Sequence, residues 1–73
     1  MVKIFIDDFG VFLGKKRNRF IVKKDGDKKE FLADDVESIV LMNPGVTISA
    51  GALRLAMDHR VQVVFAKYSG WPY

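Results

Sequence analysis

The sequence contains no cysteine and a single histidine, His59. Disulfide bonds are therefore excluded, and a structural zinc site lacks the Cys and His ligands that it needs. A domain of 73 residues buries only about 60% of the surface that its unfolded chain exposes, so its stability is marginal without further support. With disulfides and metals set aside, we expect that support to come from a partner chain or from more of the same chain.

Long apolar runs and a targeting signal are absent as well. The opening "MVKIFID" has too short an apolar stretch for a secretory signal. No run approaches the roughly 20 apolar residues of a membrane span. The absence of cysteine fits a reducing compartment. We therefore expect a soluble intracellular protein with no membrane partner.

Basic residues are concentrated in one segment. The chain has a net charge of +3, but residues 15–29 alone carry +6 and the remainder carries −3. Such a cluster can neutralise nucleic-acid phosphates, or it can be a solvated surface that keeps strand edges apart. Arg54 can likewise form a surface ion pair with Asp58. The residues that we expect to contact DNA are Lys15, Lys16, Arg17, Arg19, Lys23, Lys24 and Arg54.

The first half of the chain predicts four short strands in a β-meander. The strands are expected at residues 3–7, 11–16, 19–24 and 29–33. Turns are expected at Phe9-Gly10, in "KKRNR" and at Asp25-Gly26, where glycine takes a positive φ without penalty. In this interpretation "DFG" at residues 8–10 is a hairpin turn, since none of the other kinase motifs is present.

The second half predicts a buried strand, a helix and a last strand. Residues 39–42 form an unbroken apolar run that Pro44 and Gly45 terminate. A helix is expected from Ala50 to about His59, with Ser49 as its N-cap and Thr47 as the alternative. The last strand is expected at residues 61–66. The fold class is mostly β (α+β), a small β-sandwich or meander of about six strands with one α-helix near the carboxyl end.

The helix and the aromatic ending predict a contact with another chain or domain. The helix has more apolar surface than one small sheet covers, and the chain ends on "SGWPY". The residues that we expect at this interface are Leu53, Leu55, Met57, Trp71 and Tyr73.

No set of residues predicts catalysis in this chain. His59 is expected at the end of the helix, where the helix dipole favours it. The acidic pairs Asp7-Asp8 and Asp34-Asp35 have no evident third ligand for a cation. We therefore assign no catalytic and no metal-binding residue here.

Two stretches carry a resemblance to a known family: "FLGKKRNRFIVKK" and "DDVESIVLMNPGVTISAGALRLAMDHRVQVVFAKYSGWPY". They resemble the amino-terminal domain of the CRISPR-associated integrase, a metal-dependent DNA endonuclease that inserts new spacers into CRISPR arrays. The resemblance covers residues 1–73. The family commonly has Gly and Pro where this chain has Arg60 and Gln62, so the helix must end without glycine at the left-handed position, at a cost of about 1 kcal/mol.

The resemblance implies a small β-sandwich with one helix that pairs two subunits as a homodimer. It implies double-stranded DNA and a second CRISPR adaptation protein as partners, in a prokaryotic cytoplasm. The family's catalytic Glu, His and acidic cluster hold Mn²⁺ or Mg²⁺ in a following helical domain, so none of these residues is carried onto this chain. The ending "GWPY" resembles the linker into that domain, which makes the chain a fragment. An autonomous basic nucleic-acid-binding β-module is the alternative.

Overall fold

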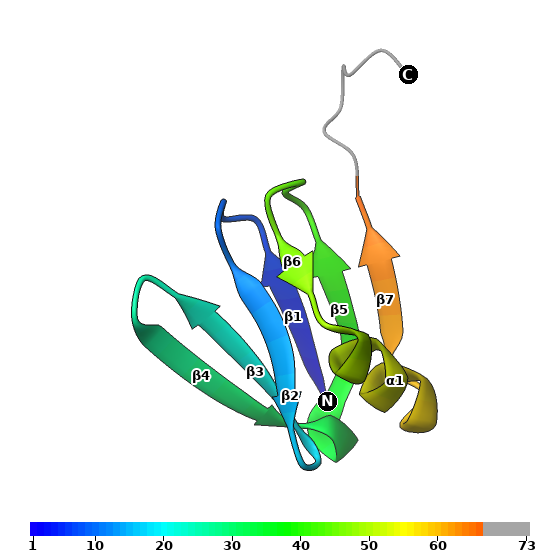
Figure 1. The fold of residues 1–73 in the computed structure, drawn as a ribbon. Helices are drawn as coiled ribbons and strands as arrows, with labels where there is room; N and C mark the ends of the chain where they lie inside the picture. The colour runs from blue at the N-terminus through cyan, green and yellow to red at the C-terminus, as the bar shows by residue number, and fades with distance from the viewer. Residues whose placement is uncertain (67–73) are drawn as a thin grey trace.

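The computed structural model describes residues 1–66. In this range the chain forms seven strands and one α-helix, which confirms the mostly-β class (Figure 1). The elements are β1 (Val2–Ile6), β2 (Phe12–Lys16), β3 (Arg19–Lys24), β4 (Asp27–Leu32), the 3₁₀ turn η1 (Ala33–Asp35), β5 (Val36–Leu41), β6 (Thr47–Ile48), α1 (Ala50–Asp58) and β7 (Gln62–Phe65).

The strands form two sheets. One sheet has the order β1-β5-β7 with all neighbours parallel, and the other has the order β4-β3-β2-β6. In the second sheet β2, β3 and β4 are antiparallel, and the short β6 pairs in parallel with β2. Helix α1 contacts β2 and β7 and so bridges the two sheets on one side (Figure 1).

The core lies between the sheets and under the helix. Phe20, Leu13 and Ile39 are its largest fully buried side chains, and they come from β3, β2 and β5. Strand β5 is central in its sheet, as its unbroken apolar run predicts. The remaining core side chains are Ile4, Ile6, Val11, Ala33, Val36, Leu41, Ala52, Leu55, Ala56 and Val61.

The predicted four-strand meander is wrong at its first strand. β1 pairs in parallel with β5, where Ile4 lies opposite Ile39, and does not pair with β2. The place beside β2 is taken by β6, since Phe12 pairs with Thr47. Residues 8–10 therefore form a crossing from one sheet to the other and not a hairpin turn. The meander has three strands, β2 to β4.

The other predicted turns are confirmed. Lys24 pairs with Asp27 across the two-residue loop Asp25-Gly26, whose φ angles are 50° and 86°. Two positive φ values at the centre of a two-residue loop are typical of a type I′ hairpin turn, whose twist matches the flanking strands.

Both ends of α1 have the expected form. The Ser49 hydroxyl accepts a hydrogen bond from the amide of Ala52 at 3.0 Å. At the other end Arg60 donates to Met57 and Val61 donates to Ala56, at 3.3 and 2.8 Å. This pair of bonds is a Schellman motif, and Arg60 takes its left-handed position with a φ of 56°.

The helix is only partly covered. Met57 is 78% exposed and Leu53 is 38% exposed. Leu55, expected at an interface, instead lies in the core with 5% exposure, so its side chain is not available to a partner. The reason is the position of α1 across β2 and β7, which turns Leu55 inward. Trp71 and Tyr73 lie outside the described residues.

Candidate nucleic-acid interface

The hairpin registers separate the basic segment into two faces. Lys16 lies opposite Arg19, and Lys23 lies between Phe12 on β2 and Lys28 on β4. Directly opposed residues in neighbouring strands share one side of a sheet. Lys16, Arg19, Lys23 and Lys28 therefore share the side of the β4-β3-β2-β6 sheet that faces away from the core. We call this side the outer basic face.

An apolar floor lies between these cations. Ile21 is only 5% exposed although it is not part of the core cluster. Its register partners are Gly14 and Glu30, and the Phe12 ring lies over Gly14, where a Cβ atom would come within 2.7 Å of Phe12 Cε2. A shallow hollow of about 280 Å³ is lined by Phe12, Gly14 and Ile21, together with Lys15, Lys16, Lys23 and Lys28. Lysine stems can cover such a floor while their ammonium groups stay in water.

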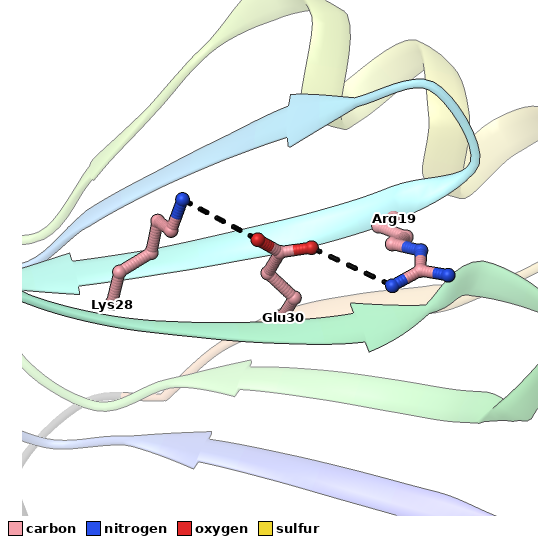
Figure 2. Close-up of polar contacts among 3 residues, drawn as sticks. All are labelled: Arg19, Lys28 and Glu30. Carbon is pink, nitrogen blue, oxygen red and sulfur yellow. Dashed lines mark ion pairs between the residues drawn. The ribbon is translucent and has the colours of Figure 1, made fainter.

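Of the side chains that β2, β3 and β4 place on the outer basic face, one is a carboxylate. Glu30 lies between two cations, with its Oε1 3.6 Å from Arg19 Nη1 and its Oε2 3.4 Å from Lys28 Nζ (Figure 2). These partly exposed ion pairs contribute little to stability. They do hold the side chains of Arg19 and Lys28 over the face. Four cations and one anion leave the face with a net positive charge.

The remaining predicted DNA contacts lie elsewhere. Lys15 is on the core side of the sheet, opposite Phe20, with its stem beside Gly51 of α1, although it also lines one end of the hollow. Lys24 Nζ is 3.0 Å from Asp8 Oδ2, and this hydrogen bond raises the pKa of Lys24 above its usual value. Arg17 is in the β2–β3 turn. Arg54 is exposed on α1, away from the strands.

Two charged residues of the outer basic face, Lys28 and Glu30, were not among the residues predicted to contact DNA. The signal for both was present in the sequence, because a two-residue loop at Asp25-Gly26 fixes the register of the flanking strands. That register places Lys23 opposite Lys28 and Ile21 opposite Glu30.

His59 has a structural position. It is the C-cap residue of α1, as expected, and its Nδ1 is 2.8 Å from Oδ1 of Asp34 in η1. The contact joins the end of the helix to the turn that precedes β5. Among residues 1–66, no three His, Asp or Glu side chains gather in a way that could hold a metal ion.

The fold and this face define a class of protein. It is a two-sheet β-domain with one bridging helix and a basic outer sheet surface. Comparison with known proteins then places it: the chain belongs to the family described as "CRISPR associated protein Cas1", whose model matches residues 4–73. None of the helices within residues 1–66 has the length and apolar character to span a membrane.

Two curated relatives agree with this family. The chain is 31% identical to "CRISPR-associated endonuclease Cas1 1" of Pyrobaculum aerophilum over 97% of its length, and 30% identical to "CRISPR-associated endonuclease Cas1 2" of Saccharolobus solfataricus over 96%. It spans only 24% and 22% of the length of these relatives.

Three solved structures share the fold at low sequence identity. The TM-score is 0.86 for a "Partial Cas6-RT-Cas1–Cas2 complex", with 16% identity over 99% of this chain and 22% of that one. It is 0.79 for a "TtCas1-DNA complex", with 11% identity over 99% and 25%. For a casposase bound to integration product it is 0.75, with 16% identity over 93% and 23%.

Proposed function

We propose that this chain is the amino-terminal scaffold and dimerisation domain of a DNA integrase that inserts new spacers into CRISPR arrays. The observation that carries the proposal is the family match over residues 4–73, of which the described residues, up to 66, form two sheets and a helix. In this role the domain pairs two subunits and sets the spacing of their active sites along double-stranded DNA. The same proposal places the protein in the cytoplasm, with a second adaptation protein as a partner.

The pairing role is supported by the exposed apolar side of α1, where Leu53 and Met57 lie. Apolar surface of a helix that the sheets of the same domain leave exposed favours association with another molecule. Sedimentation of the 73-residue chain over a range of concentrations is expected to show self-association. Met57→Lys should weaken it, whereas Leu32→Lys, a control on the outer basic face, should not. A strict monomer at high micromolar concentration would argue against the pairing role.

The DNA role is supported by the outer basic face, together with the fold shared with a structure of a DNA complex. Phosphate contacts by Lys and Arg make binding depend on salt, with a slope of roughly 0.9 per neutralised phosphate on duplex DNA. The variant Lys16→Ala/Lys23→Ala/Lys28→Ala should lower that slope by about 2 to 3. A matched control, Lys3→Ala/Arg54→Ala/Arg60→Ala, removes equal charge outside the outer basic face and its hollow. Equal slopes for the two variants would reject the outer basic face as the site.

We assign no chemical step to this chain. Catalysis, and the Mg²⁺ or Mn²⁺ ion that it needs, are proposed to belong to a helical region of the whole protein. The chain by itself is therefore expected not to cleave DNA, while the whole protein does so with either ion. Cleavage by the isolated chain that survives repeated purification would contradict this assignment.

An autonomous nucleic-acid-binding module is the second candidate. The observation that favours it is that the outer basic face is built by three consecutive strands of one small fold. The two candidates differ in one measurement: a module binds DNA as a monomer, so its affinity is not lowered by Met57→Lys. A scaffold loses affinity for long duplexes when pairing is lost.

A further inference from the structure

A cleft opens between the two sheets on the side opposite α1. Its volume is about 480 Å³, and it is lined by β1 with the residues that follow it and by the β3–β4 hairpin. No residue of β5 or β7 is among those that line it. The cleft therefore lies along the side of β1 that faces away from β5.

That side of β1 is an unpaired strand edge. Within residues 1–66, β1 pairs with β5 alone. The carbonyl of Ile6 accepts a hydrogen bond from Met42, at 2.7 Å, on the β5 side. Because successive residues of a strand direct their backbone polar groups to opposite sides, Lys3 and Phe5 direct theirs toward the cleft. β1 is thus able to accept one more strand.

The floor of the cleft is apolar. Ile4, Ile6 and Val11 are each less than 8% exposed, and Val22 and Phe31 pack against the same core. A strand placed beside β1 would direct every second side chain onto this floor. The floor therefore favours a segment in which apolar residues alternate with others.

The rim of the cleft is acidic in a chain that is basic overall. Four aspartates and two lysines line it, whereas the whole chain has a net charge of +3. One of the aspartates, Asp8, is paired with Lys24. Among the described residues, Asp7, Asp25 and Asp27 form no ion pair. Cationic side chains on the incoming segment would complement them.

We infer that this cleft binds an extended segment of a partner protein in which apolar residues alternate with lysine or arginine, and that the segment joins β1 as an added strand. Main-chain hydrogen bonds to a sheet edge with side-chain pockets beside it are an established mode of peptide recognition. Nucleic acid is disfavoured because its phosphates would meet aspartates. A second copy is disfavoured because pairing β1 with β1 would bring two acidic rims together. The inference is independent of the proposed integrase role.

The first test uses a designed probe. A short acetylated and amidated peptide of alternating valine and lysine is titrated into the 73-residue chain, and amide resonances are followed by NMR. We expect saturable shifts centred on Lys3 and Phe5, and slower hydrogen exchange at their amides. A matched peptide of alternating valine and glutamate should bind much more weakly. Equal affinity for the two peptides, or no saturable shift, would overturn the inference.

The second test separates backbone from side-chain effects. Phe5→Pro and Phe5→Ala both remove the ring, but only the proline removes the N–H at the free edge, where an edge strand tolerates it. Phe5→Pro should weaken peptide binding by roughly three- to tenfold relative to Phe5→Ala, the effect of about one hydrogen bond. Equal affinities would show that no strand is added. Amides of Lys3 and Phe5 already protected in the free chain would show that another segment occupies the edge, and would also overturn the inference.

The third test addresses the rim and does not depend on the proline variant folding. In Asp25→Asn/Asp27→Asn, the Asn-Gly sequence suits the same type I′ turn, so the fold is retained. Binding of the valine–lysine peptide should weaken roughly two- to tenfold and lose most of its salt dependence. Unchanged affinity would show that the acidic rim does not contribute to binding, and would overturn the inference that the partner segment is basic.

Discussion

Within residues 1–66, three residues other than glycine have left-handed backbone angles, at φ values of 50° to 56°: Arg17, Asp25 and Arg60. An L-residue in this region loses roughly 1–2 kcal/mol because its Cβ approaches the carbonyl oxygen. Asp25 is suited to its place because Asp is among the residues that tolerate it. Arginine has no such tolerance for left-handed angles. The backbone strain at Arg17 and Arg60 therefore reduces the stability of the fold.

We expect Arg60→Gly to raise the free energy of unfolding by about 0.5–1 kcal/mol. Glycine adopts the left-handed angle without strain and leaves both Schellman hydrogen bonds in place. Arg60→Ala is the matched control, since it removes the side chain but keeps the strain. Urea denaturation followed by circular dichroism measures both. If the alanine variant gained as much as the glycine variant, the arginine side chain and not the backbone would be the cause.

At Gly26, in the β3–β4 turn, the opposite substitution can be made, from glycine to a residue with a Cβ atom. Its φ is 86° and a Cβ built there meets no heavy atom within 4 Å, so a substitution is penalised by backbone strain alone. Gly26→Ala is expected to reduce the free energy of unfolding by about 1–2 kcal/mol. Thermal denaturation compared with the wild type measures it. A change below a few tenths of a kcal/mol would mean that the turn adopts another form.

Helix α1 places its apolar residues in two environments. Ala52, Leu55 and Ala56 are buried, while Met57 is mostly exposed. The apolar content of the helix was evident from the sequence. The sequence could not show which of these residues lie inward, because that depends on the contacts of α1 with β2 and β7. These two strands belong to different sheets.

The two classes of helix residue should respond differently to truncation. Leu55→Ala removes core contacts and is expected to reduce the free energy of unfolding by roughly 2–4 kcal/mol. Met57→Ala, on the surface, should change it by less than about 0.5 kcal/mol. Chemical denaturation at low protein concentration, where pairing does not contribute, measures both. A large loss for Met57→Ala under these conditions would mean that its side chain packs within the monomer.

The strands show where local reasoning succeeds and fails. The Asp25-Gly26 hairpin, the Ser49 cap and the central position of β5 could all be predicted, because each depends on neighbouring residues or on an unbroken apolar run. β1 was misplaced because its partner, β5, begins at Val36, and no local signal reports a parallel pairing over that separation. β6, only two residues long, has no detectable pattern. The outer basic face was half predicted, since composition located the cations but only the register assigned them to a side.

The stability of the whole domain depends strongly on β1, although three of its five residues are exposed. Ile4 and Ile6 both belong to the core, and burying each contributes roughly 1.5–3 kcal/mol. A domain this small has a total stability of only about 3–5 kcal/mol. Deletion of residues 1–6 is therefore expected to unfold the chain.

Loss of the chemical-shift dispersion of the amide resonances would report this unfolding. Phe5→Ala is the control, because Phe5 is 63% exposed and lies on the same strand outside the core. A deleted chain that kept a dispersed spectrum would show that the β2–β4 meander and α1 suffice for folding.

The parallel pairing of β1 with β5 also has a consequence for biosynthesis. Strand β1 is synthesised before β5 and pairs with it only after Leu41 has emerged from the ribosome, whereas the hairpins of β2 to β4 are complete at Leu32. Nascent chains fold from local contacts first. The segment "VKIFI" must therefore remain without its β5 partner until that strand is made, so its two core isoleucines, Ile4 and Ile6, stay unburied while residues 7–41 are translated.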